Sequence, residues 1–159
     1  MEKESTATDP LYPDFLVCKI NDRINHYLKC YESAPAALKS AIRYSMGNGG
    51  KRFRPVLCLL AAKSIGGSYD AVLPAACAIE FIHTYSLIHD DLPAIDNDDF
   101  RRGKLSCHKR FGEDIAILTG DALFAEAFNI ILKYQETNDA DLVRVLYEIS
   151  SASGAEGMV

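Results

Sequence analysis

Five aspartates lie within ten residues near the middle of the chain, and two arginines follow them. The segment reads HDDLPAIDNDDFRRG over residues 89–103, so Asp90 and Asp91 are adjacent and Asp96 comes five residues later. Like charges this close repel one another, and a bare solvated loop gains nothing from that repulsion. The spacing therefore indicates a bound counter-ion, whereas the last two aspartates of the segment are expected to cap or pair locally.

A proline after the paired acids indicates how the carboxylates can meet. Pro93 disfavours helical backbone at the residue before it, so a helix entering this segment is expected to end just after Asp91. In an unbroken helix Asp90 and Asp96 would point about 120° apart, and a break lets Asp96 turn back toward Asp90. Two converging carboxylates suit Mg²⁺, which completes its shell with water and substrate phosphate oxygens.

Cationic side chains gather in two segments, and both predict contact with phosphate. Arg101 and Arg102 present planar guanidinium groups that match phosphate oxygens. The segment GNGGKRFRP over residues 47–55 carries three more charges, and Pro55 is expected to begin a helix whose N-terminus favours anions. These charges come from Lys51, Arg52 and Arg54. Taken alone, each segment also fits a solvated loop with local ion pairs. Together, acids for Mg²⁺ and cations for phosphate predict a diphosphate site.

The composition narrows the kind of protein. The chain has 159 residues, 48% hydrophobic and 25% charged, which suits one globular domain with a core and excludes disorder. The net charge of −5 argues against nucleic acid as a partner. No apolar run approaches the length of a membrane span, and the polar N-terminus has no secretory signal. The five cysteines never form a CxxC pair, which indicates reduced thiols in a cytoplasmic protein.

Apolar residues mostly recur at intervals of three and four, which predicts an all-α fold without strands. Helices are expected over residues 14–30, 33–47, 55–66, 68–91, 111–135 and 139–154. Ser68 or Asp70 is expected to cap the fourth helix, and Asp139 the last.

The stretch 71–91 is apolar nearly all round, so it is expected to lie inside the protein. Its polar exceptions include His83, Ser86 and Asp90, which share one helix face because they are spaced i, i+3 and i+7. At 1.5 Å of rise per residue, His83 lies about 10 Å from Asp90 along the axis. A polar stripe that ends in paired acids on a buried helix predicts one wall of a cavity.

The ordered stretches GGKRFRP, HTYSLIHDDLPAIDNDDFRRGKLSCHKRFGE and ILTGDAL resemble the trans-isoprenyl diphosphate synthases, the family of farnesyl and geranylgeranyl diphosphate synthases. The acidic motif has the long DDxxxxD form of bacterial and plant members. The resemblance implies an all-α, isoprenoid-synthase-like bundle of long helices around a central cavity. It also implies a transferase that needs Mg²⁺ and joins an allylic diphosphate (dimethylallyl or geranyl) head to tail with isopentenyl diphosphate.

The resemblance also assigns roles to individual residues. The catalytic residues would be Asp90, Asp91, Asp96 and Arg101, with Asp90 and Asp96 as Mg²⁺ ligands and Arg101 on the allylic diphosphate. Isopentenyl diphosphate would be held by Lys51, Arg54, His83 and Arg102. Tyr85 and Ser86 would set product length, and the bulk of Tyr85 favours farnesyl (C15) over geranylgeranyl (C20) diphosphate. Tyr85 could instead be a core residue with no role in length.

The sequence departs from the family pattern in length. Family members are about twice as long and carry a second aspartate-rich motif, whereas no two acids are adjacent after Asp121 here. Residues 1–159 are therefore expected to form a single partial domain, the N-terminal half of a synthase, with residues 1–10 flexible. Alone it should be inactive and prone to aggregate, and the parent enzyme should be a homodimer.

Two other functions fit parts of the pattern. The chain could be a non-catalytic regulatory subunit that pairs with a full-length synthase. It could also be an HD-type metal phosphohydrolase, since His83 and the pair His89–Asp90 echo the order of ligands in that class.

Overall fold

The computed structural model describes residues 12–31 and 33–159, so the expected flexibility of residues 1–10 falls outside the described residues. The described part is mostly helical, as predicted. Its elements are α1 (Asp14–Leu28), η1 (Lys29–Tyr31), α2 (Ala36–Met46), α3 (Phe53–Ser64), α4 (Tyr69–Asp90), β1 (Phe100–Arg101), β2 (Lys104–Leu105), α5 (Cys107–Phe111), α6 (Glu113–Tyr134) and α7 (Asp139–Ser153).

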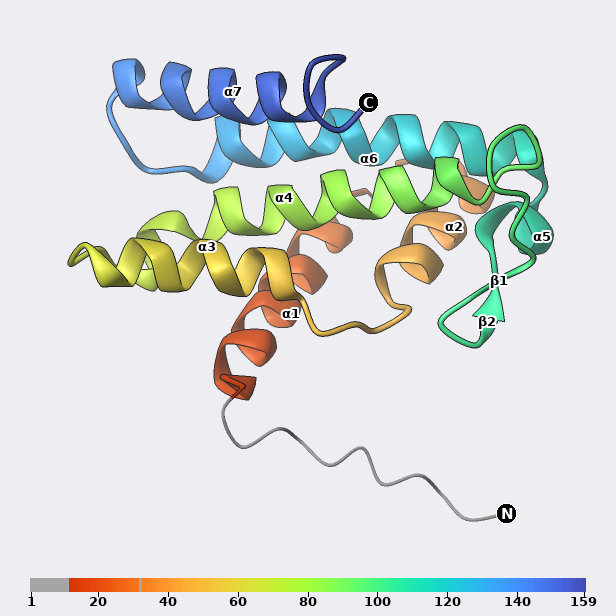
Figure 1. Cartoon of the computed structure of the whole chain (residues 1–159), viewed down its shortest axis with the longest axis horizontal. Helices are drawn as coiled ribbons and strands as arrows, with labels where there is room; N and C mark the ends of the chain where they lie inside the picture. Colours follow the sequence, from red (N-terminus) through yellow and green to blue (C-terminus); the bar gives the residue numbers. More distant parts are fainter. Residues whose placement is uncertain (1–11, 32) are drawn as a thin grey trace, which may run out of the picture.

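Helix α4 lies at the centre of the bundle, between α6 on one side and α3 on the other (Figure 1). It packs most extensively against α6 and next against α3, while α1 and α2 lie behind it. Helix α7 lies along the outer side of α6. The central position follows from the sequence, because a helix that is apolar all round needs neighbours on most of its faces.

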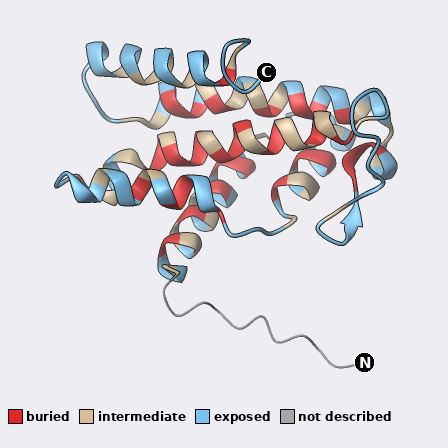
Figure 2. Cartoon of the chain, in the orientation of Figure 1, coloured by how far each residue is buried: buried red, intermediate tan, exposed pale blue. Residues whose placement is uncertain are grey.

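The core runs along the inner faces of these helices (Figure 2). From α4 it includes Leu73, Phe81 and Ile88, which are at most 4% exposed. The outer faces of α6 and α7 are different, because large apolar side chains there remain accessible. Leu118 is 54% exposed and Tyr147 is 66% exposed, so these helices present apolar surface to solvent.

The helix caps agree with the prediction at one position and differ at another. Ser68 caps α4, and its hydroxyl accepts a hydrogen bond from the Asp70 amide at 3.2 Å. The cap of α7 is Asn138, whose side chain accepts from the Asp141 amide at 3.0 Å. Asp139 is the first helical residue instead. The prediction of Asp139 is therefore wrong by one position, because asparagine and aspartate are both good caps and stand side by side.

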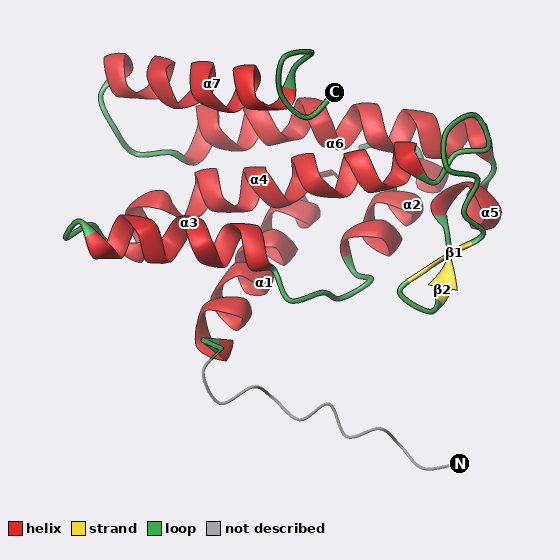
Figure 3. Cartoon of the chain, in the orientation of Figure 1, coloured by secondary structure: helices red, strands yellow, loops and turns green. Residues whose placement is uncertain are grey.

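A small hairpin breaks the all-helical pattern (Figure 3). Strands β1 and β2 are antiparallel, with Phe100 opposite Leu105 and Arg101 opposite Lys104. Both turn residues have positive φ, 53° at Arg102 and 74° at Gly103, as two-residue hairpins with matching twist require. The prediction that the chain has no strands is therefore wrong at this hairpin, because strands of two residues leave no periodic signal in the sequence.

Two features bear on the predicted cellular context. Helices α4 and α6 are long and apolar enough to cross a membrane by length and composition, contrary to the sequence estimate. In α4, 61% of the apolar window is buried inside the bundle, as expected of a core helix, whereas in α6 the buried share is 39%. All five cysteines are free thiols. Cys18 and Cys30 are exposed, whereas Cys77 and Cys107 are buried, and burial raises the pKa of Cys77 to about 12.

Candidate functional site

The acidic segment forms a turn that is held by backbone hydrogen bonds. Helix α4 ends at Asp90, and the Asp96 amide donates back to the Asp90 carbonyl at 2.8 Å. The Asn97 amide donates to the Leu92 carbonyl at 3.0 Å, with Asn97 itself at a φ of 54°. The predicted break after Asp91 is confirmed, and the chain returns Asp96 to the end of α4. Asp96 is exposed and Asp90 partly exposed, and neither carboxylate bonds to another described residue.

Asp91 has a different environment from its neighbours. It is only 2% exposed, and both of its oxygens accept from the Arg101 Nε, at 2.9 and 2.8 Å. The Arg101 Nη2 adds a third contact of 2.5 Å, and these hydrogen bonds raise the pKa of Arg101. Asp91 thereby holds the edge of the guanidinium that carries Nε and Nη2. Farther along the turn, Asp99 pairs with Lys109 at 2.8 Å, which is the local pairing predicted for the last aspartates.

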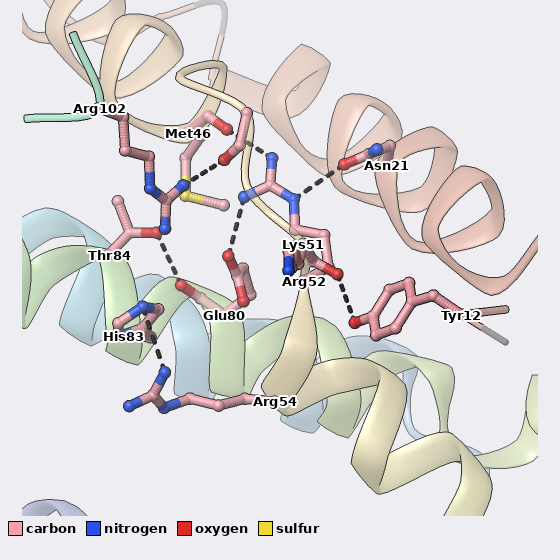
Figure 4. A network of polar contacts seen from close by, with 11 residues as sticks. Tyr12, Asn21, Met46, Lys51, Arg52, Arg54, Glu80, His83, Thr84 and Arg102 are labelled. Carbon is pink, nitrogen blue, oxygen red and sulfur yellow. Dashed lines mark hydrogen bonds and ion pairs between the residues drawn. The ribbon is translucent and has the colours of Figure 1, made fainter. Parts of the chain in front are cut away.

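Lys51, Arg54 and Arg102, which come from the two cationic segments, lie around α4 (Figure 4). Arg54 lies beside His83, with 3.4 Å between the Arg54 Nη1 and the His83 Nε2. Arg102 reaches across from the hairpin and donates to the Gly49 carbonyl. Gly50 has a φ of 120°, and a Cβ there would lie 2.3 Å from the Arg102 Nη1. A glycine is therefore required for Arg102 to approach this loop.

The electrostatic environment of His83 reflects this gathering of positive charge. Burial lowers the pKa of His83, and the nearby Arg54 guanidinium lowers it further. A neutral imidazole results at neutral pH, which can still donate a hydrogen bond to an anion through one ring nitrogen. Lys51 is exposed, and its backbone carbonyl accepts from the Tyr12 hydroxyl at 2.6 Å.

Arg52 does not join this cationic cluster, contrary to the sequence interpretation. It is 6% exposed and forms an ion pair of 2.8 Å with Glu80, which is 2% exposed. Arg52 also precedes α3, which begins at Phe53 and not at Pro55 as predicted. One sequence signal indicates that Glu80 has a partner, without identifying Arg52: Glu80 is an acid inside an otherwise apolar stretch, and a buried carboxylate needs a partner.

Arg54 and His83 also border a cleft between α4 and α7. Its volume is about 440 Å³. The walls are mostly apolar, and they include Ile79, Ile82, Ile149, Ala152 and Met158. The polar lining consists of Arg54, His83, Glu148 and Ser153. An apolar cleft that contains a guanidinium group suits a ligand that has a hydrocarbon body and an anionic head.

The side chains of Tyr85 and Ser86 have different neighbours. The Tyr85 ring is 9% exposed and packs edge-on against Phe124 of α6, with 4.9 Å between ring centroids. Tyr85 also contacts His89, and it does not line the cleft beside Arg54. The Ser86 hydroxyl donates to the His83 carbonyl at 2.9 Å. Tyr85 thus lies in the contact between α4 and α6.

The two histidines of α4 face different helices, which removes the phosphohydrolase alternative. His89 Nε2 lies 3.2 Å from the Ile117 carbonyl on α6, whereas His83 faces Arg54 on α3. Among the described residues, no three histidine, cysteine or acidic side chains cluster as metal ligands, either around these histidines or at the acidic turn. Gly120 makes room for His89, because a Cβ there would lie 2.1 Å from the His89 Nε2.

The fold is that of an isoprenoid-synthase-like helical bundle, and comparison with known proteins identifies the family. The chain matches the polyprenyl synthetase family over residues 35–157 and belongs to it. It is 52% identical over 125 residues to geranylgeranyl pyrophosphate synthase 7, chloroplastic, of Arabidopsis thaliana, covering 79% of this chain and 36% of that protein. It is 53% identical over 132 residues to farnesyl diphosphate synthase of Micrococcus luteus, covering 83% and 45%.

Solved structures agree with this assignment. The geranyltransferase of Legionella pneumophila superposes with a TM-score of 0.81 at 40% identity, covering 91% of this chain and 52% of that one. An FPP/GFPP synthase of Zymomonas mobilis gives the same TM-score at 37% identity, covering 91% and 54%. The predicted fold class is confirmed. The chain spans about a third to a half of the length of the curated relatives it matches.

Proposed function

We propose that this chain provides the first half of a prenyltransferase that joins dimethylallyl or geranyl diphosphate head to tail with isopentenyl diphosphate. The observation that carries the proposal is the arrangement around α4. An acidic turn ends the helix, and His83, two turns before Asp90, borders an apolar cleft together with Arg54 of α3. Relatives named farnesyl and geranylgeranyl diphosphate synthase support this class of reaction.

Asp90 and Asp96 would hold Mg²⁺, since both are accessible carboxylates that the turn brings to one end of α4. Their oxygen donors fit the preference of this ion for one or two carboxylates plus phosphate and water. When bound, Mg²⁺ would neutralise charge on the leaving diphosphate. Asp91 would support the site indirectly, because it holds Arg101 in one orientation.

Different cationic residues would bind the two substrates. Arg101 would bind the allylic diphosphate through the guanidinium edge that Asp91 does not occupy. Isopentenyl diphosphate would be held by Lys51, Arg54, His83 and Arg102. Charge placed in advance at the leaving group lowers the barrier to breaking the allylic C–O bond. The apolar wall of the cleft would keep water from the cationic intermediate.

The proposal extends to the chain length of the product. We propose farnesyl diphosphate, with Tyr85 and Ser86 as the residues that limit elongation. Relatives of nearly equal identity make the C15 and the C20 product, so overall similarity does not decide between them. In a complete enzyme, Tyr85→Ala would lengthen the product, and chromatography of the dephosphorylated alcohols would measure the change. An unchanged product would leave Tyr85 as a packing residue for Phe124.

The assembly and the location follow the family expectation. We propose a homodimer in the cytoplasm, and we propose that this chain is inactive without a second aspartate-rich segment. One alternative remains, a non-catalytic subunit that modulates an intact synthase.

One complementation experiment tests both functions. The chain is assayed with geranyl diphosphate, isopentenyl diphosphate and Mg²⁺, alone and with the separately produced C-terminal half of the Micrococcus luteus enzyme. We expect product only from the mixture, and a loss of several orders of magnitude with Asp90→Ala, whose circular dichroism should match the parent. Near-parental product from Asp90→Ala would remove the metal assignment. Stimulation of an intact synthase by Asp90→Ala would instead favour the subunit.

A further inference from the structure

Arg52 makes contacts that join several helices inside the protein (Figure 4). Each of its three guanidinium nitrogens has a partner on a different element. The Nε donates to Asn21 of α1 at 2.9 Å, and the Nη1 donates to Glu80 of α4 at 2.8 Å. The Nη2 donates to the carbonyl of Met46, the last residue of α2, at 2.7 Å. One buried side chain thus connects three helices to the start of the fourth.

Arg52 also has an unusual backbone conformation. Its φ of 50° lies in the left-handed region, where residues other than glycine are disfavoured. Glycine would relieve that strain, yet the position carries a long charged side chain whose contacts outweigh it. This conformation turns the Arg52 side chain inward while Lys51 and Arg54, on either side, are exposed.

The partner of Arg52 occupies an equally informative position. Glu80 lies three residues before His83 on α4, and the Thr84 hydroxyl donates to the Glu80 carbonyl at 2.8 Å. Ten residues later, or about 15 Å along the axis, α4 reaches Asp90. The ion pair therefore connects the segment that carries Lys51 to the helix that carries the histidine and the first aspartate.

We infer that the buried pair of Arg52 and Glu80 is a positioning device, which sets where Lys51 and Arg54 lie relative to His83. Arg52 would touch no substrate. This inference rests on the proposed function, because it assumes that those three residues hold a diphosphate. At metal sites, altering a residue that holds a ligating side chain in place typically lowers the affinity by about ten- to a hundredfold. We expect a loss at the lower end of this range for a residue that holds phosphate-binding side chains.

The test measures binding of inorganic pyrophosphate to the chain by isothermal titration calorimetry. Arg52→Met and Glu80→Gln should raise the Kd by about tenfold. Arg52→Lys can keep the ion pair, so its Kd should lie between those of the parent and Arg52→Met. Asp70→Asn is a control for the loss of an exposed ion pair elsewhere on α4. It breaks an ion pair of 2.6 Å between Lys19 of α1 and the start of α4, away from the cationic cluster, and should leave the Kd unchanged.

Urea unfolding followed by circular dichroism separates positioning from mere loss of folded protein, because a variant in reversible unfolding raises its apparent Kd by the inverse of its folded fraction. A purely structural role would therefore give a Kd that returns to the parent value once it is multiplied by the measured folded fraction. That result, or a Kd within twofold of the parent in both Arg52→Met and Glu80→Gln, overturns the inference. Arg54→Ala reports on the proposed function itself. If Arg54→Ala binds pyrophosphate as the parent does, the proposed site is wrong and the inference falls with it.

Discussion

The acidic turn contains two ion pairs of similar length and different burial, and they should differ sharply in their contribution to stability. Asp91 pairs with Arg101 and has a side chain that is 3% exposed, while the Arg101 side chain is 29% exposed. Asp99 and Lys109 pair at 2.8 Å with side chains that are 56% and 39% exposed. The turn therefore offers a buried pair and a matched exposed control.

We expect Asp91→Asn to lower the free energy of unfolding by about 2–3 kcal/mol. Removing one partner of a fully buried pair costs about 3–5 kcal/mol, because the other charge is left unpaired. Here Arg101 retains some contact with water, so we take a smaller value. Asp99→Asn should cost less than about 1 kcal/mol, because exposed pairs are screened by solvent. Against a typical domain stability of about 5–15 kcal/mol, the two effects are readily distinguished.

Urea unfolding followed by far-ultraviolet circular dichroism would measure both variants. The slope with urea should stay constant, which shows that the extent of unfolding is the same. A double-mutant cycle with Arg101→Gln should then give a coupling energy above about 1 kcal/mol for the pair with Asp91. Equal, small losses for Asp91→Asn and Asp99→Asn would refute the reasoning from burial, as would a coupling energy near zero.

Three further outcomes test the packing, titration and capping described above. Gly120→Ala should lower the unfolding free energy by about 1–3 kcal/mol, because its methyl group would meet the His89 ring; parental stability would contradict the close approach of α4 to α6. The pKa of His83 lies below its ordinary value of 6.5, so the unfolded chain binds more protons in this range. Stability should therefore fall as the pH drops below about 6.5 toward the folded-state pKa, and His83→Gln should flatten this slope in pH-dependent urea unfolding. Asn138→Ala should cost about 1 kcal/mol in the same assay, and Asp139→Ala distinctly less; the reverse order would return the cap to Asp139.

The long elements were the most predictable part of the fold. The sequence predicts helices over residues 68–91 and 111–135, and the structure has them at Tyr69–Asp90 and Glu113–Tyr134. Long apolar periodicity carries that information, and the proline after the paired acids marks where α4 ends. The hairpin at Arg102 was missed because its signal is confined to a two-residue turn, too short to compete with the helical pattern around it.

The candidate site was predictable in its components and less so in how they pair. The turn back to Asp90 follows from Pro93, a local effect. The partner of Arg52 lies on another helix, so no spacing in the sequence identifies it. The same holds for Asp91, whose burial against Arg101 depends on how the hairpin folds over the end of α4. Tertiary contacts thus decide which charges face a ligand and which stabilise the fold.

The graded burial of the thiols gives this protein a set of native reporters. Cys18 is exposed on the surface of α1, whereas Cys77 on α4 and Cys107 at the start of α5 are buried and must first become accessible. Because burial raises the pKa of both inner thiols, little thiolate is present until the surrounding helices separate. The rate at which each cysteine is alkylated would therefore record the opening of its own region, without any label being introduced.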